Sequence, residues 1–266
     1  MDLSKAWVIA RKDFSIFRKK KLILYLLFIL PSIIGIALPL LMLYVIPQVV
    51  SQQASDIASL TPALLASDKI LLQGILQAFV FLFVVIAAII PIYLSSYSIV
   101  GEKVEKTLEP LLATPTTDGE LLLGKILACV IPSLAAAYAG TVIFIILTDT
   151  LLPTALFPQP FLPDDAMWTM LWAVIPTASM LSVEAGIIIS SRITDVRAAT
   201  QSGGLIIAPY LVIYVIMEIS GRTVNGFHYS SLNLFIIGSV SLLADICLAF
   251  AVRSLFGRES ILTKWK

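Results

Sequence analysis

Six stretches of the chain are long and apolar enough to cross a lipid bilayer as α-helices, each of which needs about 20 mainly apolar residues. They cover residues 22–46, 74–100, 126–147, 168–190, 204–219 and 232–252, and the fifth is the shortest. Only 13% of the residues are charged, against about 25% in soluble domains, and so little charge cannot cover the surface of a soluble protein of this size. The sequence therefore predicts an all-α, polytopic membrane protein with six transmembrane helices.

Positive charge is distributed unevenly over the segments between these stretches. An even number of spans places both ends of the chain on one side, and that side receives 16 of the 18 lysine and arginine residues. Only Lys69 and Arg222 fall on the other side. Since loops rich in lysine and arginine stay in the cytoplasm, we expect a multi-pass protein of the cell membrane with both termini cytoplasmic. The net charge of +1 gives no indication of nucleic-acid binding.

Residues 1–21 have the pattern of an amphipathic helix that lies in the headgroup region of the cytoplasmic leaflet. At helical spacing, one side carries Leu3, Trp7, Ala10, Phe14 and Phe17, and the other carries Arg11, Lys12, Arg18 and Lys19. A basic orientation signal with no further role is the alternative. Residues 22–252 then form the transmembrane domain, with an outer loop at 47–73, and residues 253–266 form a cytoplasmic tail.

The cytoplasmic loop 101–125, GEKVEKTLEPLLATPTTDGELLLGK, differs from the other loops because it carries an apolar face. Leu108, Leu111 and Leu112 fall on one side of a short helix that has Pro110 in its first turn and ends before Pro115. The first proline suits the first turn of that helix, and the second ends it. An apolar face on a short cytoplasmic helix needs something to bury it. A groove on a partner protein is one answer, and the membrane surface is the other.

Residues 119–126, GELLLGKI, match seven of the eight positions of the phosphate-binding loop G-x-x-x-x-G-K-[ST]. Thr117 and Glu120 form a capping-box pattern, however, which predicts that a helix begins at Thr117, ahead of the first glycine. In a phosphate loop the residues between the glycines form an irregular turn after a strand. The last position is Ile126, which has no hydroxyl group for Mg²⁺. We therefore predict no ATP site in this stretch.

Two stretches carry a resemblance to a known family. GEKVEKTLEPLLATPTTDGELLLGKIL resembles the cytoplasmic loop after the second span of the type-2 ABC exporter permeases, in which similar TLE, LLATP and LLLGK runs occur. SSRITDVRAATQSGGLIIAP resembles that family's loop between the fourth and fifth spans, and the resemblance covers nearly the whole chain. The sequence departs from the family at Lys106, where we would expect glycine, and at Thr116–Thr117–Asp118, where a basic residue often follows LLATP. Within the family it looks most similar to the sodium or drug efflux branch.

The resemblance implies the membrane-spanning permease subunit of an ATP-driven exporter, acting as a homodimer or as a heterodimer with a second permease. It implies no catalytic residue and no cofactor in this chain, because ATP and Mg²⁺ would bind a separate ABC ATPase subunit. The loop helix would be the coupling helix that docks in a cleft of that ATPase. The residues that we expect to couple to the ATPase are Glu102, Glu105, Leu108, Glu109, Leu111 and Leu112.

Two acidic residues fall inside predicted spans, Asp245 near the middle of the sixth and Glu184 in the cytoplasmic half of the fourth. An acid at the centre of a transmembrane helix costs about 2.5–3.5 kcal/mol on insertion scales, so it needs a partner or a hydrated cavity. The two acids are candidates for a cation or proton site on the translocation path, or they hydrogen-bond to serines of the same helices and hold the bundle together. The alternative function is accordingly a self-sufficient, ion-coupled secondary transporter or channel that uses these acids. The sequence has no metal-ligand spacing and no pairing of a nucleophile with a base. It therefore predicts neither a metal site nor an intramembrane enzyme.

Overall fold

The computed structural model describes residues 2–54, 62–107, 116–151, 162–193, 195–205 and 231–255, together with residues 208, 212, 215 and 216. Within these residues every regular element is a helix, which confirms the predicted all-α class. The helices are α1 (Leu3–Lys19), α2 (Lys21–Ala54), α3 (Pro62–Val104), α5 (Asp118–Leu151), α6 (Asp165–Thr169), the π-helical segment η2 (Met170–Val174), α7 (Ile175–Arg192) and α9 (Ser231–Leu255). Residues 196–205 form a further helix.

Five helical segments in the described part of the chain are long and apolar enough to cross a membrane. They are Lys21–Tyr44, Phe79–Val104, Asp118–Leu151, Asp165–Arg192 and Ser231–Arg253. These segments correspond to the predicted first, second, third, fourth and sixth spans. Most of the predicted fifth span, 204–219, lies outside the described residues, so the count of six stays a prediction.

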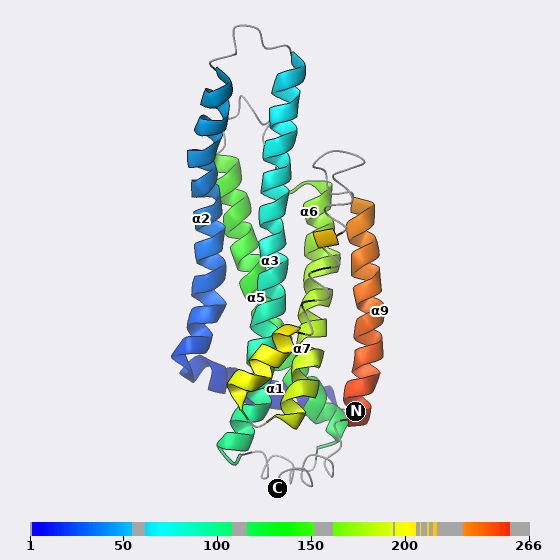
Figure 1. Cartoon of the computed structure of the whole chain (residues 1–266). Helices are drawn as coiled ribbons and strands as arrows, with labels where there is room; N and C mark the ends of the chain where they lie inside the picture. The colour runs from blue at the N-terminus through cyan, green and yellow to red at the C-terminus, as the bar shows by residue number, and fades with distance from the viewer. Residues whose placement is uncertain are drawn as a thin grey trace.

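The expected outer loop, 47–73, lies between the first two candidate spans and is helical at residues 47–54 and 62–73. α2 continues to Ala54, and α3 already begins at Pro62. At about 1.5 Å per residue the 43 residues of α3 span about 65 Å, whereas the hydrocarbon core of a bilayer is about 30 Å thick. Figure 1 shows α2 and α3 rising past the ends of the other helices. Hydropathy identifies only the apolar middle of such a helix, because alanine- and glutamine-rich ends are also good helix formers.

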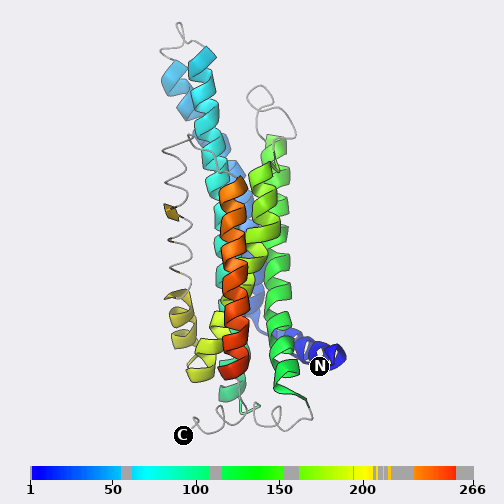
Figure 2. The same cartoon turned by 90° about the vertical axis from the view of Figure 1, so that its right-hand side faces the viewer.

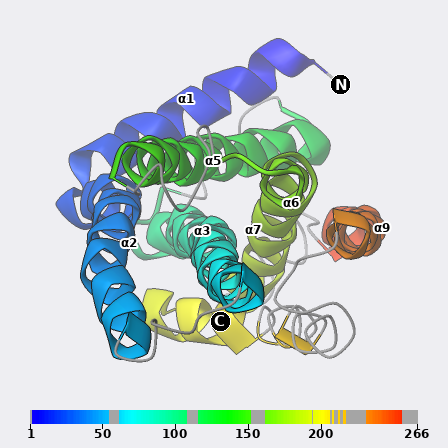
Figure 3. The same cartoon turned by 90° about the horizontal axis from the view of Figure 1, so that it is seen from above.

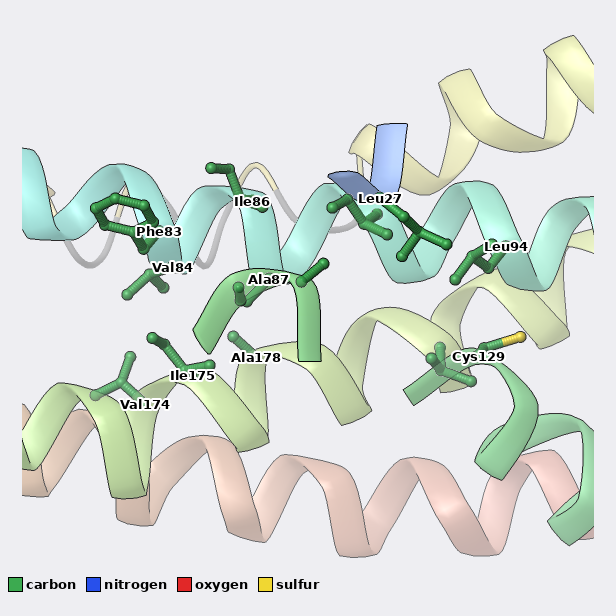
Figure 4. Close-up of a cluster of buried hydrophobic side chains, with 14 of the residues drawn as sticks. Leu27, Phe83, Val84, Ile86, Ala87, Leu94, Cys129, Val174, Ile175 and Ala178 are labelled. Atoms are coloured by element: carbon green, nitrogen blue, oxygen red, sulfur yellow. The ribbon is translucent and has the colours of Figure 1, made fainter. Parts of the chain in front are cut away.

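α3 is the central helix of the bundle. Seen from above in Figure 3, it is surrounded by α2, α5 and α7, and all three pack against it. Figure 4 shows the apolar contact of α3 with the end of η2 and the start of α7, where Val84 lies opposite Val174 and Ile175. α2 and α9 are peripheral and leave much of their apolar surface exposed, as expected of helices that face lipid.

The fourth span contains a π-helical turn just before Pro176, which has no N–H group to donate. The N–H group of Ile175 reaches back five residues to the carbonyl of Met170, which is the π pattern. The Leu171 carbonyl lies five residues before Pro176, and it accepts a hydrogen bond from the Tyr138 hydroxyl at 2.9 Å. α5 thus supplies the donor that the proline lacks, and this hydrogen bond links η2 to α5.

α1 lies across one end of the bundle. Figures 1 and 2 show it roughly perpendicular to the other helices, at the end where α3 and α7 finish and α5 begins. We call this end of the molecule the α1 end. Asp2 caps α1, since its carboxylate accepts the N–H group of Ser4 at 3.0 Å. The perpendicular orientation fits the predicted helix in the plane of a membrane surface.

Candidate functional site

The start of α5 has the predicted capping box. The Glu120 carboxylate accepts the N–H group of Thr117 at 3.0 Å, and the Thr117 hydroxyl oxygen accepts the N–H group of Glu120 at 3.3 Å. The other oxygen of the Glu120 carboxylate accepts the N–H group of Asp2 at 2.7 Å, which joins the beginning of α5 to the beginning of α1. The GELLLGKI segment is therefore helical from its first residue and does not form the open turn of a phosphate loop.

The second glycine of this segment, Gly124, lies where α1 crosses α5. A Cβ atom at Gly124 would lie 2.7 Å from the carbonyl oxygen of Ala6 and 2.8 Å from the Cβ atom of Ile9. Cβ atoms in proteins essentially never approach other atoms so closely, so the crossing requires a residue without a side chain. The close approach brings the next residue of α5, Lys125, within reach of α1.

The face of α1 that packs on α5 differs from the predicted apolar side. The buried residues of α1 are Ala6, Ile9, Ala10, Asp13 and Phe17. Leu3 and Trp7, which belong to the predicted apolar side, are 72% and 50% exposed. α1 therefore has two adjacent apolar faces, one against α5 and one free to enter the headgroup region of a membrane, and the sequence pattern did not separate them.

Lys125 is the centre of a buried polar cluster where α1, α3 and α5 meet. Its side chain is 1% exposed, and its ammonium group lies 2.7 Å from a carboxylate oxygen of Glu102 and 3.5 Å from one of Asp13. The ammonium group also donates to the backbone carbonyl and the hydroxyl of Ser98, at 3.1 and 2.9 Å. The Ser98 hydroxyl in turn donates to the Asp13 carboxylate at 2.7 Å.

Lys12 completes this cluster from the partly exposed side of α1, where its ammonium group lies 2.5 Å from the other carboxylate oxygen of Glu102. We call Asp13, Glu102, Lys125 and Lys12 the ion cluster. Its two carboxylates and two ammonium groups balance in charge, and buried ions need such partners. Because the four residues belong to α1, α3 and α5, the cluster joins the helix before residues 108–115 to the helix after them.

Lys103, the next residue along α3, joins α3 to α7. Its ammonium group donates to the carbonyl oxygens of Ser190 and Ser191, both at 2.7 Å, and to that of Ile193 at 3.3 Å. The last carbonyl groups of a helix have no N–H partner within the helix, and a lysine side chain there also interacts favourably with the helix dipole. Glu102 and Lys103 together therefore attach the end of α3 to α1, α5 and α7.

α3 ends in a C-cap with two hydrogen bonds. The N–H group of Thr107 donates to the Glu102 carbonyl at 3.0 Å, and that of Lys106 donates to the Lys103 carbonyl at 3.2 Å, which is the Schellman pattern. Lys106 has a φ of +54°, in the left-handed region that glycine adopts without steric cost. We expected glycine at this position from the permeases that the sequence resembles, and the backbone conformation gives a physical reason for it.

Glu105 lies at the surface beside this cap. Its side chain is 48% exposed, and its carboxylate lies 3.3 Å from the ammonium group of Lys20. The Tyr97 hydroxyl and the Glu105 carboxylate beside it raise the pKa of Lys20. So exposed a pair adds little to stability, and Glu105 remains within reach of a partner protein.

The structure describes two of the six predicted coupling residues. The other four lie outside the described residues: Leu108, Glu109, Leu111 and Leu112. Glu105 is accessible, as the predicted contact with an ATPase requires. Glu102 is only 4% exposed, and its carboxylate faces the lysines of the ion cluster. In this arrangement the carboxylate of Glu102 is not free to pair with an ATPase, so any part it has in coupling acts through the ion cluster.

Glu184 of α7 and Asp245 of α9 are buried inside the bundle, with exposures of 0% and 3%. Neither carboxylate has a hydrogen-bond partner among the residues that the structure describes. The nearby serines bond elsewhere, to carbonyl groups of their own helices or to each other: Ser182, Ser239, Ser241, Ser179 and Ser133. The expectation that serines of these helices hydrogen-bond the two acids is therefore wrong within the described residues.

Four charged residues that join these helices were not predicted as site residues: Lys12, Asp13, Lys103 and Lys125. A signal for Asp13 is present in the sequence, because it falls between Ala10 and Phe17 at helical spacing on an otherwise apolar side. Lys103 and Lys125 flank a charged loop, as lysines do in many membrane proteins, and only the tertiary structure places them in the interior.

Comparison with known proteins bears on nearly the whole chain. A family model described as ABC-2 family transporter protein matches residues 7–256. The matched range begins within α1 and ends just beyond α9, so it includes the ion cluster and all of the described spans. No curated protein matches the chain.

Proposed function

The chain belongs to the ABC-2 transporter family, and we propose that it is the membrane-spanning permease subunit of an ATP-driven exporter. In this proposal a separate ATPase subunit binds ATP and Mg²⁺ and docks on residues 108–115. The α1 end is cytoplasmic, the protein lies in the cell membrane, and two copies, or one copy and a second permease, form the transporter.

The proposal is supported by the way in which the two helices that flank residues 108–115, α3 and α5, are attached to the rest of the bundle. On the side of α3, Glu102 bonds to Lys125, while Lys103 holds the end of α7. On the side of α5, Glu120 is joined to the beginning of α1. A force applied to residues 108–115 is therefore passed to α1, α3, α5 and α7 together.

Buried ion pairs suit this role because they resist separation. Removing one partner of such a pair costs about 3–5 kcal/mol, so the ends of α3 and α5 move as one unit. Closure of the ATPase would press on the apolar face of Leu108, Leu111 and Leu112. The joined helix ends would then tilt the spans between an inward-open and an outward-open arrangement.

The test is co-purification of the tagged chain from its native membranes in mild detergent, followed by an ATPase assay on the eluate. We expect a stoichiometric nucleotide-binding partner that is lost when Leu111 and Leu112 are both replaced by alanine. The matched control replaces Leu232 and Leu243, two exposed leucines of α9, and should keep the partner. Undiminished ATP-driven transport by the Leu111 and Leu112 double variant would refute the coupling role.

A second candidate function, an ion-coupled transporter without an ATPase, is favoured by one observation. Glu184 and Asp245 are buried without partners in the described part of the chain. This function predicts that the purified chain alone moves ions across liposome membranes along an ion gradient. Transport that requires both the ATPase and ATP would exclude it.

A further inference from the structure

Glu184 and Asp245 lie at similar depths on two packed helices. α7 and α9 run in the same direction side by side (Figure 1). Gly238 of α9 contacts η2, since a Cβ atom at Gly238 would lie 2.8 Å from the Cβ atom of Ala173. From this contact, Asp245 is seven residues along α9 and Glu184 is eleven residues along η2 and α7. The difference of four residues is about one helical turn, or about 6 Å along the helix axes.

The direction of the side chains reduces this separation along the helix axes. Helical side chains lean toward the N-terminus of their helix, and the Glu184 side chain is one methylene longer than that of Asp245. Glu184 therefore leans back toward the level of Asp245. Since α7 packs on α9 and both side chains are buried, the two carboxyl groups lie in the same part of the bundle.

The described part of the chain provides no counter-charge for this pair. No basic side chain there lies within ion-pair distance of either acid. The basic side chains that the structure describes on α3, α5, α7 and α9 are engaged elsewhere or exposed at the α1 end: Lys103, Lys125, Arg192 and Arg253.

Two such carboxyl groups are unfavourable in either protonation state. When both are ionised, they repel each other in surroundings of low dielectric constant. When one or both are protonated, each O–H donor needs an acceptor within hydrogen-bond distance, and neither group has one among the described residues, the other carboxyl group included. A small metal cation between them relieves both problems, because carboxylate oxygens are the ligands that hard cations prefer.

We propose that Glu184 and Asp245 together bind one small metal cation within the membrane, between α7 and α9. The described residues contain no group of three or more His, Cys, Asp or Glu side chains that could enclose a metal ion. The cation therefore keeps part of its hydration shell and exchanges readily, as an ion on a transport path must. This site goes beyond the coupling proposal and does not depend on it, because it involves the spans alone.

The test is thermal unfolding of the purified chain in lipid nanodiscs. NaCl, KCl, LiCl and MgCl₂ are each compared with choline chloride at equal ionic strength and pH. We expect at least one metal cation to raise the unfolding midpoint by several degrees in a saturable manner, since a ligand that binds only the folded state stabilises it by mass action. Glu184→Gln and Asp245→Asn should each abolish this rise. Asp165→Asn, which changes an exposed acid at the other end of the same span, should keep it.

Two results would overturn the proposal. One is an equal midpoint in all five salts. The other is a midpoint that responds to pH but to no metal cation, because the acids would then hold only protons. If either variant does not fold, equilibrium dialysis of the unaltered chain against the same cations decides the question. One bound ion per chain supports the site, and no bound ion refutes it. Retention of the ATPase is scored separately on the same preparations, so a failed cation site is not confused with failed coupling.

Discussion

Replacement of Lys125 by methionine is the sharpest test of the ion cluster. The Lys125 ammonium group is buried between the carboxylates of Glu102 and Asp13, at 2.7 and 3.5 Å. Methionine is flexible, unbranched and uncharged, so it adapts to the vacated space while removing both ion pairs. Two buried carboxylates then remain with only Lys12 to balance them, and Lys12 contacts Glu102 from the partly exposed side.

The expected loss follows from the burial of the pairs. Removing one partner from a buried ion pair costs about 3–5 kcal/mol. A change of 1 kcal/mol shifts the unfolding midpoint by about 2–4 °C in chains of 150–250 residues. Taking the middle of the first range, we expect Lys125→Met to lower the midpoint by about 8–16 °C.

The assay is thermal unfolding in detergent, followed by tryptophan fluorescence, together with ATPase stimulation by the reconstituted complex. A triple variant with Lys125→Met, Glu102→Gln and Asp13→Asn leaves no uncompensated carboxylate and should recover most of the lost stability, as neutral replacements of buried ion pairs often do. Its ATPase stimulation should stay low, because the neutral side chains no longer tie α3 to α5. A fall of less than about 2 °C for Lys125→Met, or about 1 kcal/mol or less, would refute this account of the cluster.

Three further changes test single contacts. Lys106→Gly should raise the free energy of unfolding by up to about 1 kcal/mol, because a left-handed conformation costs a residue with a side chain about 1–2 kcal/mol and the greater freedom of glycine in the unfolded chain offsets part of the gain. Chemical denaturation in detergent measures this, and a gain of equal size for Lys106→Ala would contradict the reason given. Gly124→Ala should push α1 off α5, which lowers the unfolding midpoint and speeds tryptic cleavage within α1. Gly204→Ala is the control that should neither lower the midpoint nor speed cleavage, because an added Cβ atom there has no atom within 4 Å. Tyr138→Phe removes the donor to the Leu171 carbonyl and should cost about 1 kcal/mol in the same denaturation assay, and equal stability of the variant would show that another donor replaces it.

Features set by neighbouring residues could be predicted from the sequence. Thr117 and Glu120 specify the start of α5 because a capping box involves only one helical turn. The described spans follow from apolar stretches for the same local reason. The family glycine expected at Lys106 also has a local cause, since the Schellman cap requires a left-handed residue there.

Features set by distant residues could not be predicted in this way. Lys125 contacts Asp13, which lies 112 positions earlier, and nothing near either residue in the sequence indicates the other. Glu102 was expected to contact the ATPase because of the family resemblance. Its burial is possible only because Lys125 and Lys12 neutralise it, which is a property of three helices together.

The crossing of α1 over α5 at Gly124 imposes an order on the biosynthesis of the protein. α1 is translated first, but the surface that receives Ile9 and the ammonium group that neutralises Asp13 both belong to the third span. A ribosome that adds about 5–20 residues per second needs about 6–22 s to travel the 112 positions from Asp13 to Lys125. During that interval α1 lacks its main packing surface on α5 and can contact only α2 and α3. Its docking on α5 therefore has to follow the synthesis of the third span.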